Sequence, residues 1–193
     1  SSLATTAPPV VDGEKVTVTM DQLTVRGVDF DVYDLIVNED TDNVTFEELS
    51  FNGDKLTLDG YKFTTGNEKM TAITGDIEIN GRDTRLQVNQ DIYGNININS
   101  QSTILGAANV TGNIQVSGEE AVIEVDETIT GDVTVVSEGS ITNLDANKIK
   151  GRTDINGGSL FTRVDFEGPV YLENDASFSS TSEDSIETDN QVV

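Results

Sequence analysis

Residues 73–79 read ITGDIEI, and five later segments of the chain repeat this phrase with small changes. The later segments are residues 92–98 (IYGNINI), 110–116 (VTGNIQV), 129–135 (ITGDVTV), 149–155 (IKGRTDI) and 166–172 (FEGPVYL). Their central glycines lie 19, 18, 19, 20 and 17 residues apart, along the series Gly75, Gly94, Gly112, Gly131, Gly151 and Gly168. A repeat of about 20 residues is typical of a solenoid or another repeat array.

Each phrase alternates apolar and polar residues, which is the pattern of a strand with one buried face. The apolar positions are mostly Ile and Val, whose branched side chains favour strands. In four of the six phrases Asp or Asn follows the central glycine. Such a pair permits a sharp corner, because both residues tolerate left-handed backbone angles. We therefore expect the six glycines to be corner residues, and the Asx side chains beside them to form hydrogen-bonded ladders.

Shorter strand-like segments lie between the phrases, so each repeat holds two or three strands. This predicts an all-β fold, a single-chain parallel β-helix (β-solenoid) with about 18–19 residues per coil. Each strand pairs with its copies in the coils above and below, at a spacing of about 4.8 Å. The handedness rule for parallel connections favours right-handed winding. An antiparallel β-sandwich is the alternative, but it gives no reason for one glycine phrase to recur at nearly constant intervals.

The first third of the chain is also rich in strand signals but is less regular. Residues 11–18 (VDGEKVTV) resemble residues 51–58 (FNGDKLTL), and two coils of about 20 residues would separate them. We interpret residues 10–70 as an irregular β section, a cap or subunit interface, before the regular solenoid of residues 71–178, because terminal repeats are normally atypical. A separate small β domain, with a boundary between residues 66 and 72, is the alternative.

The two ends of the chain differ from the repeats in composition. Residues 1–9 end in Pro8-Pro9 and indicate an extended N-terminal arm, either unstructured or lying on a neighbouring subunit. Residues 179–193 are rich in Ser, Thr, Asp and Glu, and predict a flexible acidic tail. A sharper hypothesis makes residues 186–193 an added strand on another subunit. The start, without Met or a basic apolar leader, suggests a processed N-terminus and hence export.

The chain is strongly acidic, with 35 acidic against 11 basic residues and a formal net charge of −24. This charge argues against a nucleic-acid partner, because the phosphate backbone would be repelled and no basic stripe is present. Three explanations of the acidity stay open: surface solvation at high salt as in halophilic proteins, Ca²⁺ binding, or suppression of edge-to-edge association. No run of 18 apolar residues occurs, so we expect no membrane insertion.

Two acidic clusters are candidate Ca²⁺ sites. Asp40 and Asp42 lie in the oxygen-rich segment 38–43, and Asp29 and Asp31 share the outer face of an expected strand. The segment lacks the Gly and the distant Glu of an EF-hand loop, so a solvated turn is the alternative. Like charges on one strand face cost stability unless they are screened or bound to a cation.

Two sequons occur, with their acceptor side chains at Asn43 and Asn109. If the chain is exported, both are candidate glycosylation sites. Chance matches are also expected in a chain so rich in Asn and Thr.

We expect no enzymatic activity. The chain has no cysteine and no histidine, which removes the commonest general base and the commonest transition-metal ligand. Carboxylates on strands, such as Glu124, Asp126, Asp132 and Asp154, would be the candidates for polysaccharide chemistry. However, these polar positions are acidic throughout, and no nucleotide-binding glycine loop or nucleophile elbow is present. The sequence therefore predicts no catalytic residue and no cofactor other than candidate Ca²⁺.

The phrase Gly-[Asp/Asn]-[Ile/Val]-x-[Ile/Val], as in residues 75–79, 112–116 and 131–135, resembles the repeat of bactofilins. The resemblance covers about half of the chain, from residue 73 to residue 172. It implies a right-handed β-helix that polymerises end to end without nucleotide, flanked by disordered tails. The apparently processed start, the long irregular N-terminal section and the acidity depart from that family.

Unpaired backbone groups at the two ends of a solenoid must be capped or used. The last phrase is regular and is followed only by polar residues, so we expect the ends to stack. The sequence thus predicts a structural subunit of an extracellular or cell-surface filament, fibre or layer, whose partners are copies of itself. The alternatives are an adhesin or viral fibre-type module that binds a surface glycan or protein, and a bactofilin-like intracellular cytoskeletal polymer.

Overall fold

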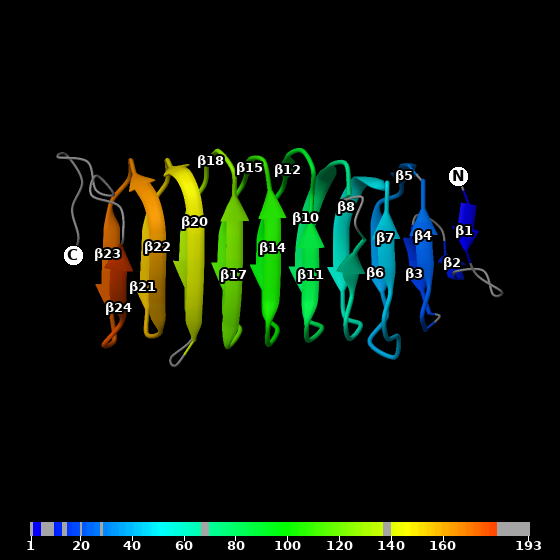
Figure 1. Ribbon diagram of the computed structural model, residues 1–193, viewed down its shortest axis with the longest axis horizontal. Coiled ribbons are helices and arrows are strands. Elements are labelled where there is room, and N and C mark those ends of the chain that lie inside the picture. Colours follow the sequence, from blue (N-terminus) through cyan, green and yellow to red (C-terminus); the bar gives the residue numbers. More distant parts are fainter. Residues whose placement is uncertain are drawn as a thin grey trace.

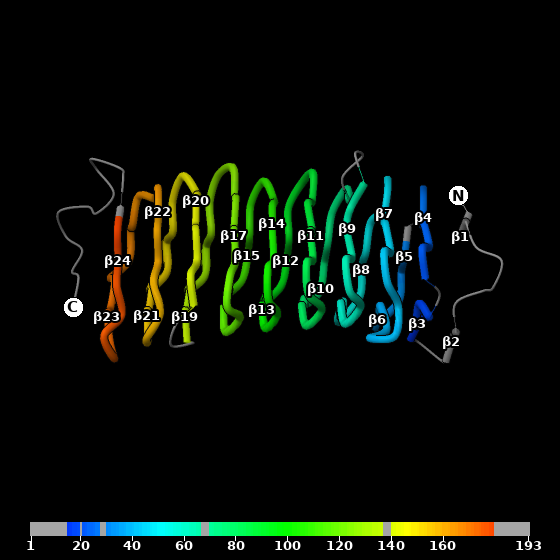
Figure 2. Tube along the Cα trace, turned by 60° about the horizontal axis from the view of Figure 1, so that its bottom comes forward, coloured from blue at the N-terminus to red at the C-terminus, as the bar shows by residue number. Residues whose placement is uncertain are grey.

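The chain forms a rod of stacked β-coils, in which every strand lies across the long axis (Figure 1). This computed structural model describes residues 2–4, 10–12, 15–19, 21–27, 29–66, 70–136 and 140–180. These residues make about eight turns, and the successive coils lie side by side along the rod (Figure 2). Among them, no helix is long and apolar enough to cross a membrane.

Three faces, here called A, B and C, run along the rod, and within each face neighbouring strands pair in parallel. Face A holds β3 (Lys15–Val18), β6 (Asp34–Val37), the second part of β8 (Ser50–Leu58), the second part of β10 (Ile73–Ile79), β13 (Ile96–Ile98), β16 (Ile114–Val116), β19 (Val133–Val135), β21 (Thr153–Asn156) and β23 (Val170–Glu173). Face B holds β4 (Thr24–Arg26), β7 (Thr45–Glu47), β9 (Thr64–Thr65), β11 (Thr84–Gln87), β14 (Thr103–Ala107), β17 (Glu120–Val125), the first part of β20 (Ile141–Ile149), the first part of β22 (Ser159–Phe166) and β24 (Ser177–Ser180). Face C holds β5 (Asp29–Asp31), the first parts of β8 and β10, β12 (Ile92–Tyr93), β15 (Val110–Thr111), β18 (Thr128–Ile129) and the last parts of β20 and β22.

The repeated phrase sets the register of the stack. Ile73 pairs with Ile92 and Ile92 with Val110 on face C, while Ile77 pairs with Ile96 and Ile96 with Ile114 on face A. The same phrase positions continue in register to the last coil. This confirms the predicted parallel β-solenoid, and the parallel pairing excludes the β-sandwich.

The core is a narrow column of inward-facing apolar side chains. The alternating residues of the phrases point inward, and all of them except Leu172 in the last phrase are buried, as Ile73, Ile77 and Ile79 illustrate. In the N-terminal third, aromatic side chains fill the column, and the rings of Phe46 and Phe63 meet edge to face at 4.9 Å between centroids. Each inward side chain packs on its copies in the coils above and below. A narrow interior of this kind is filled by a small share of hydrophobic residues.

The N-terminal section continues the same stack. Residues 15–18 and 55–58 lie on face A with β6 between them, so the second half of the sequence match marks equivalent positions two coils apart. The first half of the match does not. Residues 51 and 52 pair in parallel within the stack, whereas β2 (Val10–Asp12) folds back and pairs antiparallel with β3.

Part of the expected arm also joins the sheet. Strand β1 (Ser2–Ala4) pairs antiparallel with β4, so that β1 and β2 lie on the first coil on faces B and A. At the other end, β24 extends the regular pairing to Ser180. The rest of the arm and residues 181–193 lie outside the described residues, and so does the proposed pairing of residues 186–193.

Candidate functional site

In each coil the corner glycine lies between the face C strand and the face A strand. The glycines of successive coils are stacked directly on one another. A Cβ atom on Gly94 would lie 2.0 Å from the carbonyl oxygen of Gly75, and one on Gly112 would lie 2.0 Å from that of Gly94. The same close approach, at 2.1–2.3 Å, occurs at Gly131, Gly151 and Gly168. Sequence reasoning attributed these glycines to left-handed backbone angles, but only the first three of the six have φ between +132° and +159°. What all six share is that the backbone of the coil below leaves no room for a side chain.

Beside the glycines, the Asx side chains form a ladder that joins one coil to the next. Asp76 Oδ1 accepts a hydrogen bond from the Asn95 backbone N–H at 2.9 Å, and Asn95 Oδ1 accepts from Asn113 N–H at 3.0 Å. Asn113 Oδ1 accepts from Asp132 N–H, and Asp132 Oδ1 accepts from Arg152 N–H, both at 2.8 Å. Each corner N–H that turns away from the strand pairing is thereby satisfied.

This corner ladder stops before the C-terminal end of the rod. Arg152 carries no side-chain oxygen that could accept a hydrogen bond, and Pro169, at the next corner, has no N–H to donate. Arg152 instead pairs with Asp154, with its Nε 2.8 Å from Oδ2, and its guanidinium lies 3.9 Å from the ring centroid of Tyr171. The hydrogen bond to Asp154 raises the pKa of Arg152. The ladder therefore needs no acceptor at the last corner, because Pro169 has no N–H.

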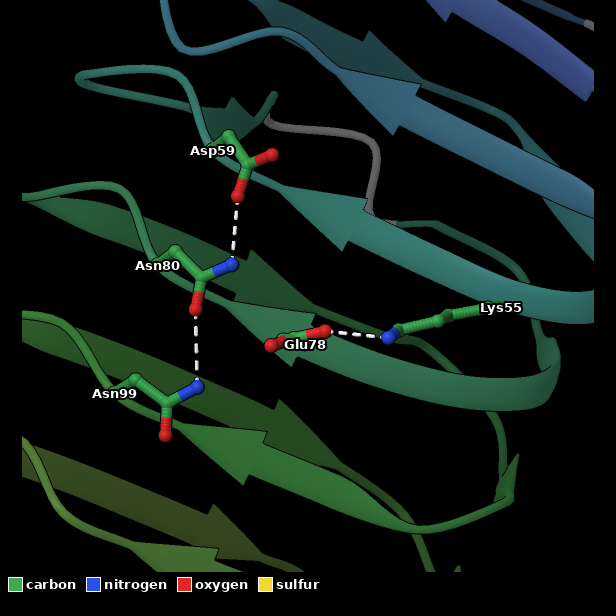
Figure 3. Close-up of polar contacts among 5 residues, drawn as sticks. All are labelled: Lys55, Asp59, Glu78, Asn80 and Asn99. Carbon is green, nitrogen blue, oxygen red and sulfur yellow. Dashed lines mark hydrogen bonds and ion pairs between the residues drawn. The ribbon is translucent and has the colours of Figure 1, made fainter.

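A second ladder follows the turns after four consecutive face A strands, β8, β10, β13 and β16, and Figure 3 shows its first three members. The Asn80 amide donates to Asp59 Oδ1 at 2.6 Å, and the Asn99 amide donates to Asn80 Oδ1 at 2.9 Å. The Ser117 hydroxyl then donates to Asn99 Oδ1 at 2.8 Å. The corresponding position in the next coil is Val136, which is 38% exposed and cannot continue the ladder.

Between the two ladders, face A carries a shallow polar groove, lined among others by Glu78, Asn97, Gln115 and Thr134. One basic residue lies at its N-terminal end. Lys55 Nζ lies 2.5 Å from Glu78 Oε2, and this interaction raises the pKa of Lys55 (Figure 3). The groove presents amides and carboxylates without an aromatic side chain for sugar stacking.

The four candidate Ca²⁺ ligands are spread over a strand and a loop. Asp29 and Asp31 belong to β5, whereas Asp40 and Asp42 follow β6. Asp31 Oδ1 accepts from the Asn52 amide at 3.3 Å. Over the part of the chain that the structure describes, no group of three or more Asp, Glu, His or Cys residues could hold a metal ion.

The two sequon asparagines have different surroundings. Asn43 is exposed, with φ of 55°. Asn109 is part-buried: its amide donates to Asp91 Oδ1 at 3.1 Å, and its Oδ1 accepts from the Thr128 N–H at 3.2 Å. A glycan is attached to the amide nitrogen, which at Asn109 is the atom that donates to Asp91 in the neighbouring coil.

The strand carboxylates considered for catalysis lie in two neighbouring coils but at different positions around them. Glu124 lies on face B, Asp126 follows it, and Asp132 and Asp154 lie at the corner and on face A. Asp132 and Asp154 are both bonded to Arg152, as described above. Arg152 thus links Asp132 and Asp154, while Glu124 belongs to face B.

The C-terminal end of the rod, where the sequence predicts stacking, differs from the regular coils. In the described residues, β23 pairs only with β21, and β24 pairs only with β22. Leu172, Ala176 and Phe178 pack against the core there but are only partly buried, and the Phe178 ring lies 5.7 Å from that of Phe166. Among the described residues, this end therefore combines partly exposed core side chains with strands that have no outer partner.

Comparison with protein-family models, with curated proteins and with solved structures finds no match for this chain. The parallel solenoid agrees with the fold that the bactofilin-like phrase implies. Membership of that family is not shown.

Proposed function

We propose that the chain is a non-enzymatic structural subunit, which self-assembles through the ends of its solenoid into an extracellular filament, fibre or surface layer. The observation that carries the proposal is the C-terminal end, where two strand edges lack a second partner among the described residues and three apolar side chains are partly exposed. A free strand edge next to exposed apolar side chains is a template for pairing with another chain. The rigid, regularly hydrogen-bonded rod suits a load-bearing role.

The acidity adds a condition to this assembly. Two chains of formal charge −24 repel each other, and added salt shortens the range of that repulsion to about 3 Å at 1 M. Assembly is therefore promoted by salt, which fits a subunit that works in a saline exterior.

Sedimentation velocity over a range of protein and salt concentrations tests the proposal. We expect the average particle to grow with both variables, and Phe178→Ser to suppress this growth because it removes apolar surface from the end. Phe161→Ser is the matched control, since Phe161 is 45% exposed and points outward from β22, one strand before the end. A chain that stays monomeric in every condition, with or without Ca²⁺, contradicts the proposal.

A second function is favoured by the groove on face A, whose amide and carboxylate side chains can hydrogen-bond a surface glycan or protein. In that case the chain is an adhesin-type binding module. A glycan array that gives a hit abolished by Gln115→Ala, from a protein that does not polymerise, would favour this function over self-assembly. An intracellular polymer of the bactofilin kind differs from the first proposal only in location, and the precursor sequence distinguishes the two.

A further inference from the structure

The two ends of the rod are built differently. At the N-terminal end, β3 has β2 on its outer side and β4 has β1, both in antiparallel pairing. At the C-terminal end, neither β23 nor β24 has an outer partner among the described residues. β1 and β2, together called the arm from here on, therefore lie on two faces of one end (Figure 1), whereas no described strand lies outside β23 and β24 on the same two faces of the other end.

The apolar core follows the same asymmetry. In the first coil, Val16, Val18 and Val25 are at most 6% exposed, so the core is closed where the arm lies over it. In the last coil, Leu172 and Phe178 are only partly buried. The arm thus covers the core at the N-terminal end, and no described segment covers the core at the C-terminal end.

The open strands and the covered strands belong to the same faces. Parallel pairing connects β3 to β23 without a break along face A, and β4 to β24 along face B. A second copy stacked head to tail would therefore place its β23 beside β3 and its β24 beside β4. All strands would then run in one direction around the rod, and the solenoid would continue across the joint.

We propose that the arm is a replaceable end cap, and that β23 and β24 of a second copy displace β1 and β2 to form a head-to-tail joint. This inference rests on the proposed self-assembly and names the surface and the partner that it uses.

The arm and the second copy offer similar strand pairing. The arm supplies three residue pairs to β3 and three to β4. β23 and β24 each have four residues, enough to pair with all of β3 and β4. The second copy also buries its own Leu172 and Phe178. The arm has the advantage of being in the same molecule, which corresponds to an effective concentration on the order of millimolar. The joint is therefore disfavoured in dilute solution and forms when the chain is concentrated or the arm is released.

The sequence after Ser180 supports a second copy as the occupant of the open end. Steps of 17, 18 or 19 residues from the inward Val170 and Leu172 reach only polar residues between Glu187 and Gln191, and a step of 20 brings a single apolar residue, Val192, into the Leu172 row. The size of the end agrees with a reversible joint. Three faces of roughly 15–20 Å enclose roughly 500 Å² per end with side chains, and about 1,000 Å² buried in total is near the lower limit for a specific interface.

The arm can be locked by a disulfide in the full-length chain. Ala4 and Thr24 are direct cross-strand partners, at a Cα separation within the range of a disulfide, and the chain has no other cysteine. The Ala4→Cys/Thr24→Cys variant is compared in its oxidised and reduced forms by sedimentation at the same protein and salt concentration. We expect the oxidised form to stay monomeric and the reduced form to assemble. A second variant, Leu3→Pro, removes a strand N–H from the middle of β1 and should assemble at a concentration at least ten-fold lower than the wild type.

The polarity of the joint is tested by a second cysteine pair. Thr24 and Ser179 occupy the same outward row of face B, at opposite ends of the rod. In the Thr24→Cys/Ser179→Cys variant, a head-to-tail joint brings the two cysteines of different copies together. Mild oxidation should then give a ladder of dimers, trimers and longer products in denaturing gels, while Ser179→Cys alone should not cross-link.

The outcomes separate the inference from the proposed function. Equal assembly of the locked and reduced forms, or cross-linking by Ser179→Cys alone, overturns the replaceable cap while leaving self-assembly intact. Absence of assembly in the wild type, the reduced pair and Leu3→Pro alike overturns both.

Discussion

Replacing Gly112 by alanine tests the stacked corner directly. The new Cβ would lie 2.0 Å from the Gly94 carbonyl oxygen and 2.6 Å from its carbon, where at least 3.0 Å is needed. One coil must therefore move by about 1 Å relative to the other, which is overpacking at a cost of about 1–3 kcal/mol. The φ of +150° adds backbone strain of about 1–3 kcal/mol, and the stiffer unfolded chain returns about 0.5–1 kcal/mol. We expect a net loss of about 3 kcal/mol in the free energy of unfolding.

Gly106→Ala is the matched control in the same coil region. A Cβ there would meet its nearest neighbours at 3.6 and 3.7 Å, which is ordinary contact. Urea unfolding followed by far-ultraviolet circular dichroism, at one fixed salt concentration, compares the midpoints of both variants with the wild type. Because repeat proteins can unfold in stages, the midpoint and the shape of the transition are both recorded. If Gly112→Ala lies within about 1 kcal/mol of Gly106→Ala, the close-stacking explanation of the glycines is wrong.

Three further substitutions test other contacts of the rod. Asn113→Ala removes the acceptor of a coil-to-coil hydrogen bond and should lower the free energy of unfolding by about 1 kcal/mol. Its control, Asn97→Ala in the groove, should change the free energy of unfolding by less than about 0.5 kcal/mol, and urea midpoints measure both. Thr142→Val replaces a buried hydroxyl that has no hydrogen-bond partner by a methyl group, and thermal unfolding should show a gain of about 1 kcal/mol; a loss would show that the hydroxyl is satisfied. Lys55→Met should be destabilising at neutral pH, because the hydrogen bond to Glu78 raises the pKa of Lys55 above 10.5 in the folded state. The difference in the free energy of unfolding between the variant and the wild type should persist below that pH and vanish as the pH rises through the folded-state pKa.

The regular part of the fold was predictable because it depends on local alternation repeated at a constant interval. The phrase at residues 73–79 shows which side chains face inward, and its recurrence shows which residues become neighbours in the stack. Both facts depend only on spacing, so the parallel register follows from the sequence without long-range information.

The corner glycines show a limit of this reasoning. Their position was predictable, but the reason was wrong for Gly131, Gly151 and Gly168, whose φ angles are not in the left-handed region. These positions require glycine because an added Cβ would lie only 2.1–2.3 Å from a carbonyl oxygen of the neighbouring coil. A distance between coils cannot be read from the sequence pattern of one coil.

The end structure was harder to predict because it departs from the repeat. Residues 11–18 resemble a parallel repeat, yet β2 turns back on β3. A two-residue link with glycine first, Gly13-Glu14, separates these strands in the sequence and favours an antiparallel hairpin. That local signal, given more weight than the match to residues 51–58, would have identified the hairpin. The partner of β1 depends on which coil comes first, and the exposure of Phe178 depends on which coil comes last. No local pattern contains that information.

Electron microscopy and fibre diffraction of the concentrated full-length chain in high salt test the central claim most directly. A single molecule extends roughly 40 Å along the rod axis, from the coil spacing of about 4.8 Å. Self-assembly through the ends predicts unbranched filaments one solenoid wide and many times longer than 40 Å, with a reflection at about 4.8 Å along the filament axis. Separate rods no longer than one molecule at every concentration would contradict it.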